Sequence, residues 1–127
     1  MEVMMVIQCF LVLFLLQLKH LVIDFLWQPE YEWRNKGTFG HPGGIIHSLK
    51  HAVITIAILI IFNHNVALVF LIAFAEFVAH YLIDYSKMNI NKHYKYSPDK
   101  NSEFWYLLGV DQFLHQVCYL LIALAVL

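Results

Sequence analysis

The chain contains 127 residues, of which 61% are hydrophobic and only 13% are charged. Ordinary soluble domains have about 45–50% apolar and about 25% charged residues, so this composition excludes that class and indicates a membrane protein. The formal net charge of −1 argues against a nucleic-acid-binding protein that relies on a basic surface, so we expect no nucleic-acid partner. The length predicts a single membrane domain over residues 1–127.

The first predicted helix covers residues 3–27, which exceeds the roughly 20 residues that a bilayer core requires. No basic residue precedes this apolar segment and no small-residue cleavage site follows it, so we expect a retained membrane helix and not a signal peptide. Residues 10–16 are apolar throughout, and Pro29 ends the helix. Polar residues gather near its far end: Gln17, Lys19, His20, Asp24 and Gln28.

Two more helices follow a polar loop over residues 30–44, which ends in the turn-rich sequence Gly-His-Pro-Gly-Gly. The second helix is expected over residues 45–62 and the third over residues 66–87. Because only residues 63–65 connect them, the sequence predicts an antiparallel hairpin.

A second long polar loop over residues 88–103 precedes the fourth predicted helix, over residues 104–127. The basic residues all lie in the two long loops or on helices near them: Lys19, Arg34, Lys36, Lys50, Lys87, Lys92, Lys95 and Lys100. Cytoplasmic loops of membrane proteins carry the excess of Lys and Arg. We therefore expect both long loops in the cytoplasm and both termini on the extracytoplasmic side.

Each predicted helix carries one pair of metal-ligand residue types four positions apart. The pairs, in chain order, are His20 and Asp24, His47 and His51, His80 and Asp84, and Asp111 and His115. Residues at i and i+4 lie on the same face of a helix. The His-xxx-Asp pair of the first helix recurs on the third, and the pair of the second helix recurs as Asp-xxx-His on the fourth. This pattern predicts an all-α, polytopic four-transmembrane-helix bundle built from two repeated helical hairpins.

In the predicted orientation, all eight residues lie within two to three helical turns of the cytoplasmic boundary. Ionisable groups inside apolar helices are costly, and they are treated first as a functional site. Five imidazoles and three carboxylates suit zinc or another first-row divalent ion. Because eight donors exceed the needs of one tetrahedral ion, the prediction is two ions, or one ion with a surrounding shell of oriented residues. The alternative is a purely structural polar network.

Glu76 is the first candidate for a catalytic role. It lies on the same helix face as His80 and Asp84 but one turn farther from the cytoplasm. There it could act as a general base or orient a ligand imidazole. The alternative is a structural hydrogen bond within the bundle, with one of three partners: Gln17, Thr55 or Gln112.

Lys87 is the second candidate, because it follows the His80 and Asp84 pair at the cytoplasmic mouth of the predicted site. Together with Lys36 and Arg34 it could bind an anionic head group or a phosphate. The alternative is that all three are ordinary basic residues of the cytoplasmic side.

These residues form a set of motifs: His20-xxx-Asp24, Lys36, His47-xxx-His51, His80-xxx-Asp84-xx-Lys87 and Asp111-Gln112-xx-His115. Over nearly the whole chain the set resembles a family of small bacterial and phage membrane proteins catalogued as domain of unknown function 3307. The resemblance implies a four-helix protein of a bacterial or phage-encoded inner membrane, and it implies no established activity. A looser likeness, in residue types alone, is to the membrane-bound metal-dependent hydrolases.

We therefore expect an intramembrane hydrolase that depends on a divalent metal and acts on a lipid or lipid-linked phosphate at the cytoplasmic leaflet. The alternatives are a metal-ion or proton transporter, and a non-catalytic small membrane protein with a structural polar or metal site. Transport is disfavoured because the segments beyond the polar layer offer no polar lining: residues 10–16, 56–62, 66–75 and 120–127. A four-helix monomer is also too small for alternating access, whereas a homodimer could provide it, so the oligomeric state stays open.

Overall fold

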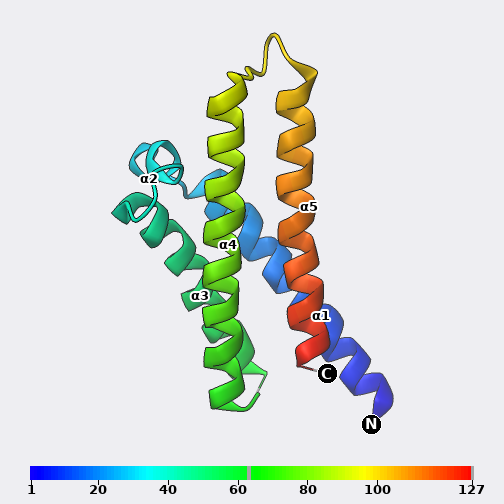
Figure 1. Ribbon diagram of the computed structural model, residues 1–127. Coiled ribbons are helices and arrows are strands. Elements are labelled where there is room, and N and C mark those ends of the chain that lie inside the picture. The colour runs from blue at the N-terminus through cyan, green and yellow to red at the C-terminus, as the bar shows by residue number, and fades with distance from the viewer. Residues whose placement is uncertain (63, 127) are drawn as a thin grey trace.

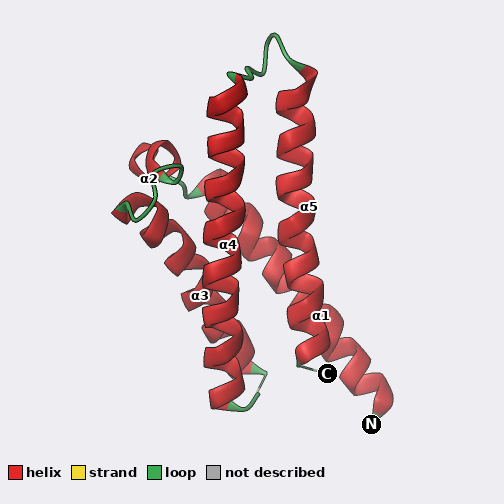
Figure 2. Cartoon of the chain, in the orientation of Figure 1, coloured by secondary structure: helices red, strands yellow, loops and turns green. Residues whose placement is uncertain are grey.

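The computed structural model describes residues 1–62 and 64–126, and over these residues all regular secondary structure is helical (Figure 2). Helix α1 (Glu2–Leu21) continues directly into η1 (Val22–Leu26), a single π-helical segment. The short helix α2 (Glu30–Asn35) follows, and then three long helices complete the chain: α3 (Pro42–Ile61), α4 (Val66–Tyr94) and α5 (Ser102–Ala125). Residues 63 and 127, which fall in the predicted connector and at the end of the fourth predicted helix, lie outside the described residues.

Among the residues that the structure describes, four helical segments are long and apolar enough to cross a membrane: Glu2–Leu26, Pro42–Ile61, Val66–Tyr94 and Ser102–Ala125. Successive helices run in opposite directions, and both termini lie at one end of the bundle (Figure 1). Helix α3 packs between α1 and α4, and α5 packs on both α4 and α1, so the four helices form a closed ring. Helix α2 and the connection from α4 to α5 lie at the opposite end from the termini (Figure 1).

The helix boundaries differ from the predicted ones at the end of the bundle that carries the long connections. Helix α4 continues to Tyr94, beyond the predicted limit at residue 87, and ends where Lys95 adopts a left-handed conformation with φ 56°. Residues 88–94 are polar but contain no glycine or proline, so nothing in them interrupts the helix. Polarity marks where a helix leaves the apolar layer, whereas a helix ends where its backbone hydrogen bonding is broken.

Helix α3 likewise starts before its predicted limit, at Pro42. The Nδ1 atom of His41 accepts a hydrogen bond from the Gly43 amide at 3.0 Å, and Pro42 occupies the first turn, where its missing amide hydrogen is not needed. Helix α2 lies within the predicted polar loop over residues 30–44. The loop is thus shorter and more ordered than its composition indicated.

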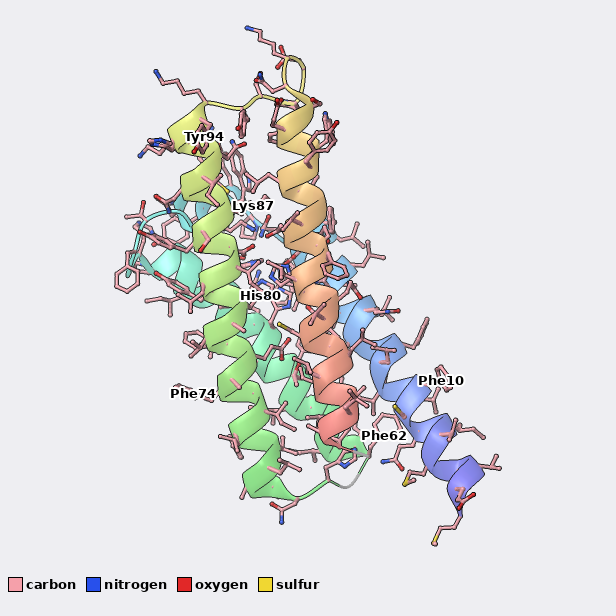
Figure 3. All side chains as sticks on the ribbon, turned by 45° about the vertical axis from the view of Figure 1, so that its right-hand side comes forward. Phe10, Phe62, Phe74, His80, Lys87 and Tyr94 are labelled. Carbon is pink, nitrogen blue, oxygen red and sulfur yellow. The ribbon has the colours of Figure 1, made fainter. Side chains whose placement is uncertain are left out.

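The apolar core lies in the half of the bundle nearest the termini. Each of the four long helices contributes side chains that are fully buried: Val12, Leu16, Leu59, Val69 and Tyr119. Large hydrophobic side chains also cover the outside of the bundle, and Phe10 and Phe74 point away from it with 68% and 65% of their surface exposed (Figure 3). An apolar outer surface of this extent is what a surrounding lipid phase requires.

Helix α2 packs closely on the start of α3. A Cβ atom added at Gly43 would lie 2.7 Å from the carbonyl oxygen of Tyr31, and one at Gly44 would lie 3.1 Å from the Cα atom of Lys36. Only glycine permits this approach without a shift of the backbone. The contact turns one side of α2 toward the interior, so that Glu32 and Lys36 become buried.

Candidate metal centre

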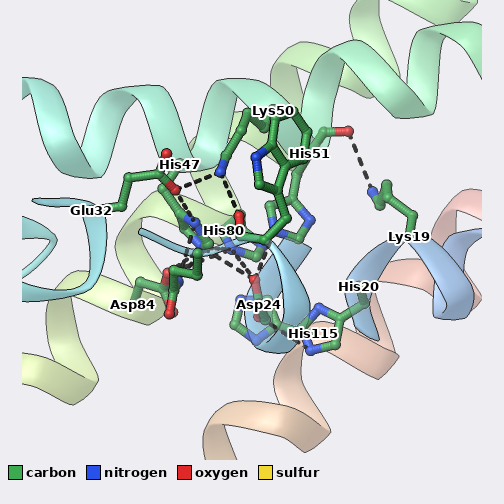
Figure 4. A network of polar contacts seen from close by, with 12 residues as sticks. Lys19, His20, Asp24, Glu32, His47, Lys50, His51, His80, Asp84 and His115 are labelled. Atoms are coloured by element: carbon green, nitrogen blue, oxygen red, sulfur yellow. Dashed lines mark hydrogen bonds and ion pairs between the residues drawn. The ribbon is translucent and has the colours of Figure 1, made fainter. Parts of the chain in front are cut away.

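The structure brings seven of the eight predicted ligand residues into one buried cluster in the interior of the bundle (Figure 4). Three groups of residues each present ligand atoms within 4.8 Å of one another. The groups are Asp24, His47, His51 and His80; His20, Asp24 and His115; and His80, Asp84 and His115. Because each group shares a residue with the others, they form one continuous site with contributions from η1 and all four long helices.

Asp24 lies at the centre of the first group. Its Oδ1 atom is 2.8 Å from Nε2 of His51 and 3.1 Å from Nε2 of His47. The Nε2 atoms of His47 and His80 are 3.2 Å apart. Two ligand atoms that each lie ~2.0–2.1 Å from a tetrahedral zinc ion are ~3.3 Å from one another. The three separations quoted are close to this value, and the Nε2 atom of His80 lies somewhat farther from Oδ1 of Asp24, at 3.9 Å. The group can therefore face a single ion after small side-chain shifts.

The π-helical segment η1 places Asp24 in this central position. Its backbone bonds span five residues, as in the 2.7 Å bond from the Trp27 amide to the Val22 carbonyl. The extra residue per turn rotates the side chains that follow relative to a regular α-helix, and such segments recur at functional sites. As a result the two oxygens of Asp24 face different partners, with Oδ1 toward His51 and Oδ2 3.3 Å from Nε2 of His20.

The third group joins α4 to α5 through His80, Asp84 and His115. The Oδ2 atom of Asp84 lies 3.5 Å from Nε2 of His80, and the rings of His80 and His115 are 4.2 Å apart between centroids. All three residues are at most 2% exposed. They extend the first group toward α5.

Several buried polar atoms of the cluster have no hydrogen-bond partner among residues 1–62 and 64–126. They are Nδ1 of His51, Oδ1 of Asp84, Oδ1 of Asp111 and both ring nitrogens of His115. An unpaired buried polar group costs about 1–3 kcal/mol, and native proteins rarely leave one. An imidazole nitrogen and a carboxylate oxygen are both ligands for a divalent ion. The donor set and these unpaired atoms therefore fit a bound divalent cation.

Asp111 is the predicted ligand that lies outside the three groups. Its Oδ2 atom accepts hydrogen bonds from the side-chain amide of Gln112 at 2.9 Å and from the Lys87 ammonium at 3.5 Å. Its Oδ1 atom is 3.9 Å from Nδ1 of His115. Asp111 thus lies beside the cluster, between His115 and Lys87.

Protein groups engage both ring nitrogens of His20, as they do for His47. Its Nδ1 atom is 2.8 Å from the Tyr119 hydroxyl, and its Nε2 atom is 2.8 Å from Oε1 of Gln112. The simplest protonation has the Tyr119 hydroxyl donating to Nδ1 and the Nε2 hydrogen donating to Gln112. In this arrangement His20 orients Asp24 and Gln112 around the cluster.

Glu32 reaches the cluster from α2, and the sequence analysis did not identify it. Its Oε2 atom lies 3.3 Å from Nδ1 of His47 and forms an ion pair with the Lys50 ammonium at 2.6 Å (Figure 4). A carboxylate that accepts the Nδ1 hydrogen of a histidine directs the other ring nitrogen of that histidine toward a metal. Glu32 and Lys36 are four positions apart, and this spacing within the predicted loop was the available signal.

Lys36 is buried and lies beside the cluster, where its ammonium donates to Oδ2 of Asp84 at 3.0 Å. Burial acts to lower the pKa of Lys36, but the carboxylates of Asp84 and Asp24 outweigh it and hold the pKa above its ordinary value. Lys36 is therefore a fixed positive charge that balances Asp84. Arg34, which was considered with it at the mouth, is instead exposed and paired with Glu30.

Glu76 lies one turn deeper than the cluster, in a buried ion pair with Lys19. The Lys19 ammonium donates to Oε1 of Glu76 and also to the Thr55 hydroxyl at 2.7 Å. Both charged residues are 4% exposed. Thr55, one of the three predicted partners of Glu76, instead accepts a hydrogen bond from Lys19, which was not among them. Through these contacts Lys19 connects α1 to α3 and α4, on the side of the cluster that faces the termini.

The fold and the site together define a class: a four-helix bundle of membrane-spanning length with a buried His and Asp cluster in its interior. The chain belongs to the family described as "Protein of unknown function (DUF3307)", whose model matches residues 11–127. This match confirms the resemblance seen in the motifs, and the matched range includes all eight predicted ligand residues. No curated protein and no solved structure matches the chain.

Proposed function

We propose that the chain is an intramembrane hydrolase that depends on a divalent metal, most simply zinc, and acts on a lipid or lipid-linked phosphate at the cytoplasmic leaflet. The observation that carries the proposal is the central group, in which Asp24 lies 2.8 Å from His51, 3.1 Å from His47 and 3.9 Å from His80, all buried in the bundle. A site for lipid chemistry has to lie within reach of the membrane, and this one is enclosed by helices of membrane-spanning length.

The residues that would hold the first ion are Asp24, His47, His51 and His80. A second ion would lie in the third group, where Asp84 and His115 are joined by His80. A bound divalent ion would lower the pKa of a water and polarise a phosphoryl or acyl group.

The surrounding residues prepare the ligands for this role. Glu32 orients His47, and Lys36 balances the charge of Asp84. Lys87 carries an ammonium group that is 19% exposed at the edge of the site, where it can attract an anionic substrate. Asp111 holds this ammonium next to His115.

We further propose that both termini are extracytoplasmic, in a bacterial or phage-encoded inner membrane, and that the bundle derives from two repeated hairpins. The end of the bundle with α2 and the α4–α5 connection carries the loop residues Arg34, Lys36, Lys95 and Lys100. The positive-inside rule assigns this end to the cytoplasm. The site would then open toward the cytoplasmic leaflet.

The second candidate, transport of a metal ion or proton, has less support. Between the cluster and the end of the bundle with the termini, the interior is filled by Val12, Leu16, Leu59 and Val69, each fully buried. A conduction path needs a polar or wet lining across the whole membrane. The packed interior therefore favours a closed pocket over a path.

Metal content and hydrolysis, measured on the same purified protein, test the proposal. We expect zinc in the wild type, release of phosphate from a lipid phosphate, and loss of both in His51→Ala. His64→Ala is the matched control, because His64 lies at the opposite end of the bundle beside Gln8, and it should retain both. Metal without hydrolysis of any lipid class would favour transport, and the absence of metal would leave a structural polar network.

A further inference from the structure

Two cavities of about 240 Å³ each lie between α4 and α5, outside the metal cluster. They follow one another along the same pair of helices. On α4 the lining positions recur every three or four residues from Ile72 to Ile90, and on α5 they recur from Leu107 to Ala125. Positions with this spacing share one helix face, so the two cavities are parts of one α4–α5 groove.

The inner cavity is the one nearer the termini, beside residues 72–79 of α4, and it is apolar. Small side chains line it, among them Ala75, Ala79 and Ala125, together with Cys118. Glu76 is its one ionisable carboxylate, and Lys19 neutralises that group from inside the bundle. A hydrocarbon chain can therefore lie here without meeting an uncompensated charge.

The outer cavity, beside residues 82–90 of α4, is partly polar. Apolar residues form its walls, but Ser86, Lys87 and Asp111 also line it. Asp111 lies one turn before His115 on the same face of α5, so the outer cavity borders the metal cluster. The groove is thus polar at one end and apolar along the rest of its length. At the polar end the Lys87 ammonium is 3.5 Å from Asp111, and the Lys87 side chain remains 19% exposed.

The depth of Lys87 in the membrane agrees with a groove that is polar at one end and apolar along the rest. If α4 enters the hydrocarbon core at Val66, a core of about 30 Å corresponds to about 20 residues and ends near Ser86. Lys87 then lies at the level of the lipid head groups. The distance along α4 from Lys87 to Ile72 is about 22 Å, which exceeds the ~15 Å thickness of one leaflet's hydrocarbon layer. Only a long chain can therefore fill the groove from end to end.

We propose that the α4–α5 groove is the lateral entry and binding site for a long-chain membrane lipid with an anionic phosphate head group. The head group lies at Lys87 beside Asp111 and the metal cluster, and the chain runs along the groove past Ala79 to the inner cavity. This inference rests on the proposed hydrolase function and names the orientation of its substrate. The arguments for a lipid are the cationic end at head-group depth and the neutral, apolar remainder.

A photoreactive phosphatidic acid tests the proposal, with a diazirine at the end of one long acyl chain and the protein reconstituted in phosphatidylcholine vesicles. We expect cross-links to residues 72–79 and 118–125. Ala79→Phe should fill the groove at its middle and reduce these cross-links at least tenfold while the bound zinc is retained. Ala57→Phe is the matched control, because Ala57 is exposed on α3 away from the groove, and it should leave cross-linking unchanged.

Two further arms separate the outcomes. Lys87→Gln should abolish the preference for phosphatidic acid over diacylglycerol carrying the same diazirine. Groove cross-links without phosphate release would retain the binding site and overturn the hydrolase. Cross-links spread evenly over the exposed faces of all helices, or unchanged by Ala79→Phe, would overturn the groove as a lipid site. Oxidative joining of two chains through Cys118 in a Cys9→Ser background would show that a second copy fills it, which would also overturn the proposal.

Discussion

The contact between Glu32 and His47 joins a residue of the short helix α2 to the proposed metal site. The carboxylate accepts the Nδ1 hydrogen of His47 and so directs Nε2 toward Asp24. We expect Glu32→Ala to weaken zinc affinity about 10- to 100-fold, as is typical for the loss of a residue that orients a ligand. Competition with a chromophoric chelator measures the affinity.

Glu30→Ala is the control for this prediction. Glu30 lies on the same short helix, but its carboxylate is exposed and pairs with Arg34. Exposed ion pairs contribute little, so this variant should bind zinc as the wild type does. Equal affinities in the two variants would show that Glu32 does not orient the site.

The ion pair between Lys19 and Glu76 gives a second prediction at the residue scale. Removing one partner of a buried pair leaves an uncompensated charge and costs about 3–5 kcal/mol. We therefore expect Glu76→Ala to lower the melting temperature in detergent sharply, and the double variant Lys19→Met with Glu76→Met to recover most of the loss.

The folded double variant also decides between the two roles considered for Glu76. If Glu76 is only the counter-ion of Lys19, the double variant retains zinc and hydrolyses its substrate. If Glu76 is the general base, the double variant retains zinc but its turnover falls by roughly 10²–10⁴. Glu76→Gln should show the same loss of turnover in the second case.

At the scale of elements, the position of α2 depends on the glycines at the start of α3. A Cβ atom at Gly43 would meet the Tyr31 carbonyl at 2.7 Å, and a backbone group cannot move aside as a flexible side chain can. Gly43→Ala should displace α2, withdraw Glu32 and Lys36 from the cluster, and destabilise the fold by about 1–3 kcal/mol. The melting temperature and the zinc affinity of this variant should both decrease.

Gly109→Ala is the matched control for this displacement. A Cβ atom at Gly109 meets nothing within 4 Å among the described residues, and Gly109 lies inside helix α5. Alanine favours a helix over glycine by up to ~1 kcal/mol, so this variant should be neutral or slightly more stable. Unchanged zinc affinity in Gly43→Ala would mean that α2 does not support the site.

At the scale of the whole molecule, the distribution of basic residues predicts the orientation in the membrane. Single cysteines at Thr38 and Lys100, both exposed, should react with an impermeant thiol reagent only when the cytoplasmic side is accessible. A cysteine at Glu2 should react from the extracytoplasmic side. The measurements use sealed vesicles of known orientation, with Cys9 and Cys118 replaced by serine. Labelling of Lys100→Cys from the extracytoplasmic side would reverse the proposed topology.

The sequence alone was sufficient to predict the long helices and the composition of the cluster. Membrane-length helices are visible because runs of apolar residues have to match the thickness of a bilayer. Pairs at i and i+4, such as His80 and Asp84, are visible because they depend on the geometry of one helix only. The common depth of the four pairs then indicated that they meet, and seven of the eight residues do so.

The partners of each charged group were decided by packing between helices. Lys19 meets Glu76 although they are far apart in the sequence, and no periodicity within one helix relates two residues on different helices. The rotation of each helix about its axis sets such contacts, and η1 changes that rotation just before Asp24.

The same limit explains the remaining differences from the sequence-based expectations. Glu32 and Lys36 were assigned to a polar loop, and they become buried because Gly43 and Gly44 let α2 approach α3. The α4–α5 groove likewise arises where small side chains of one helix face those of its neighbour. Sequence patterns determine which side chains lie on each face of a helix. The close approach of two helices determines which groups are paired, which stay unpaired, and where space is left for a ligand.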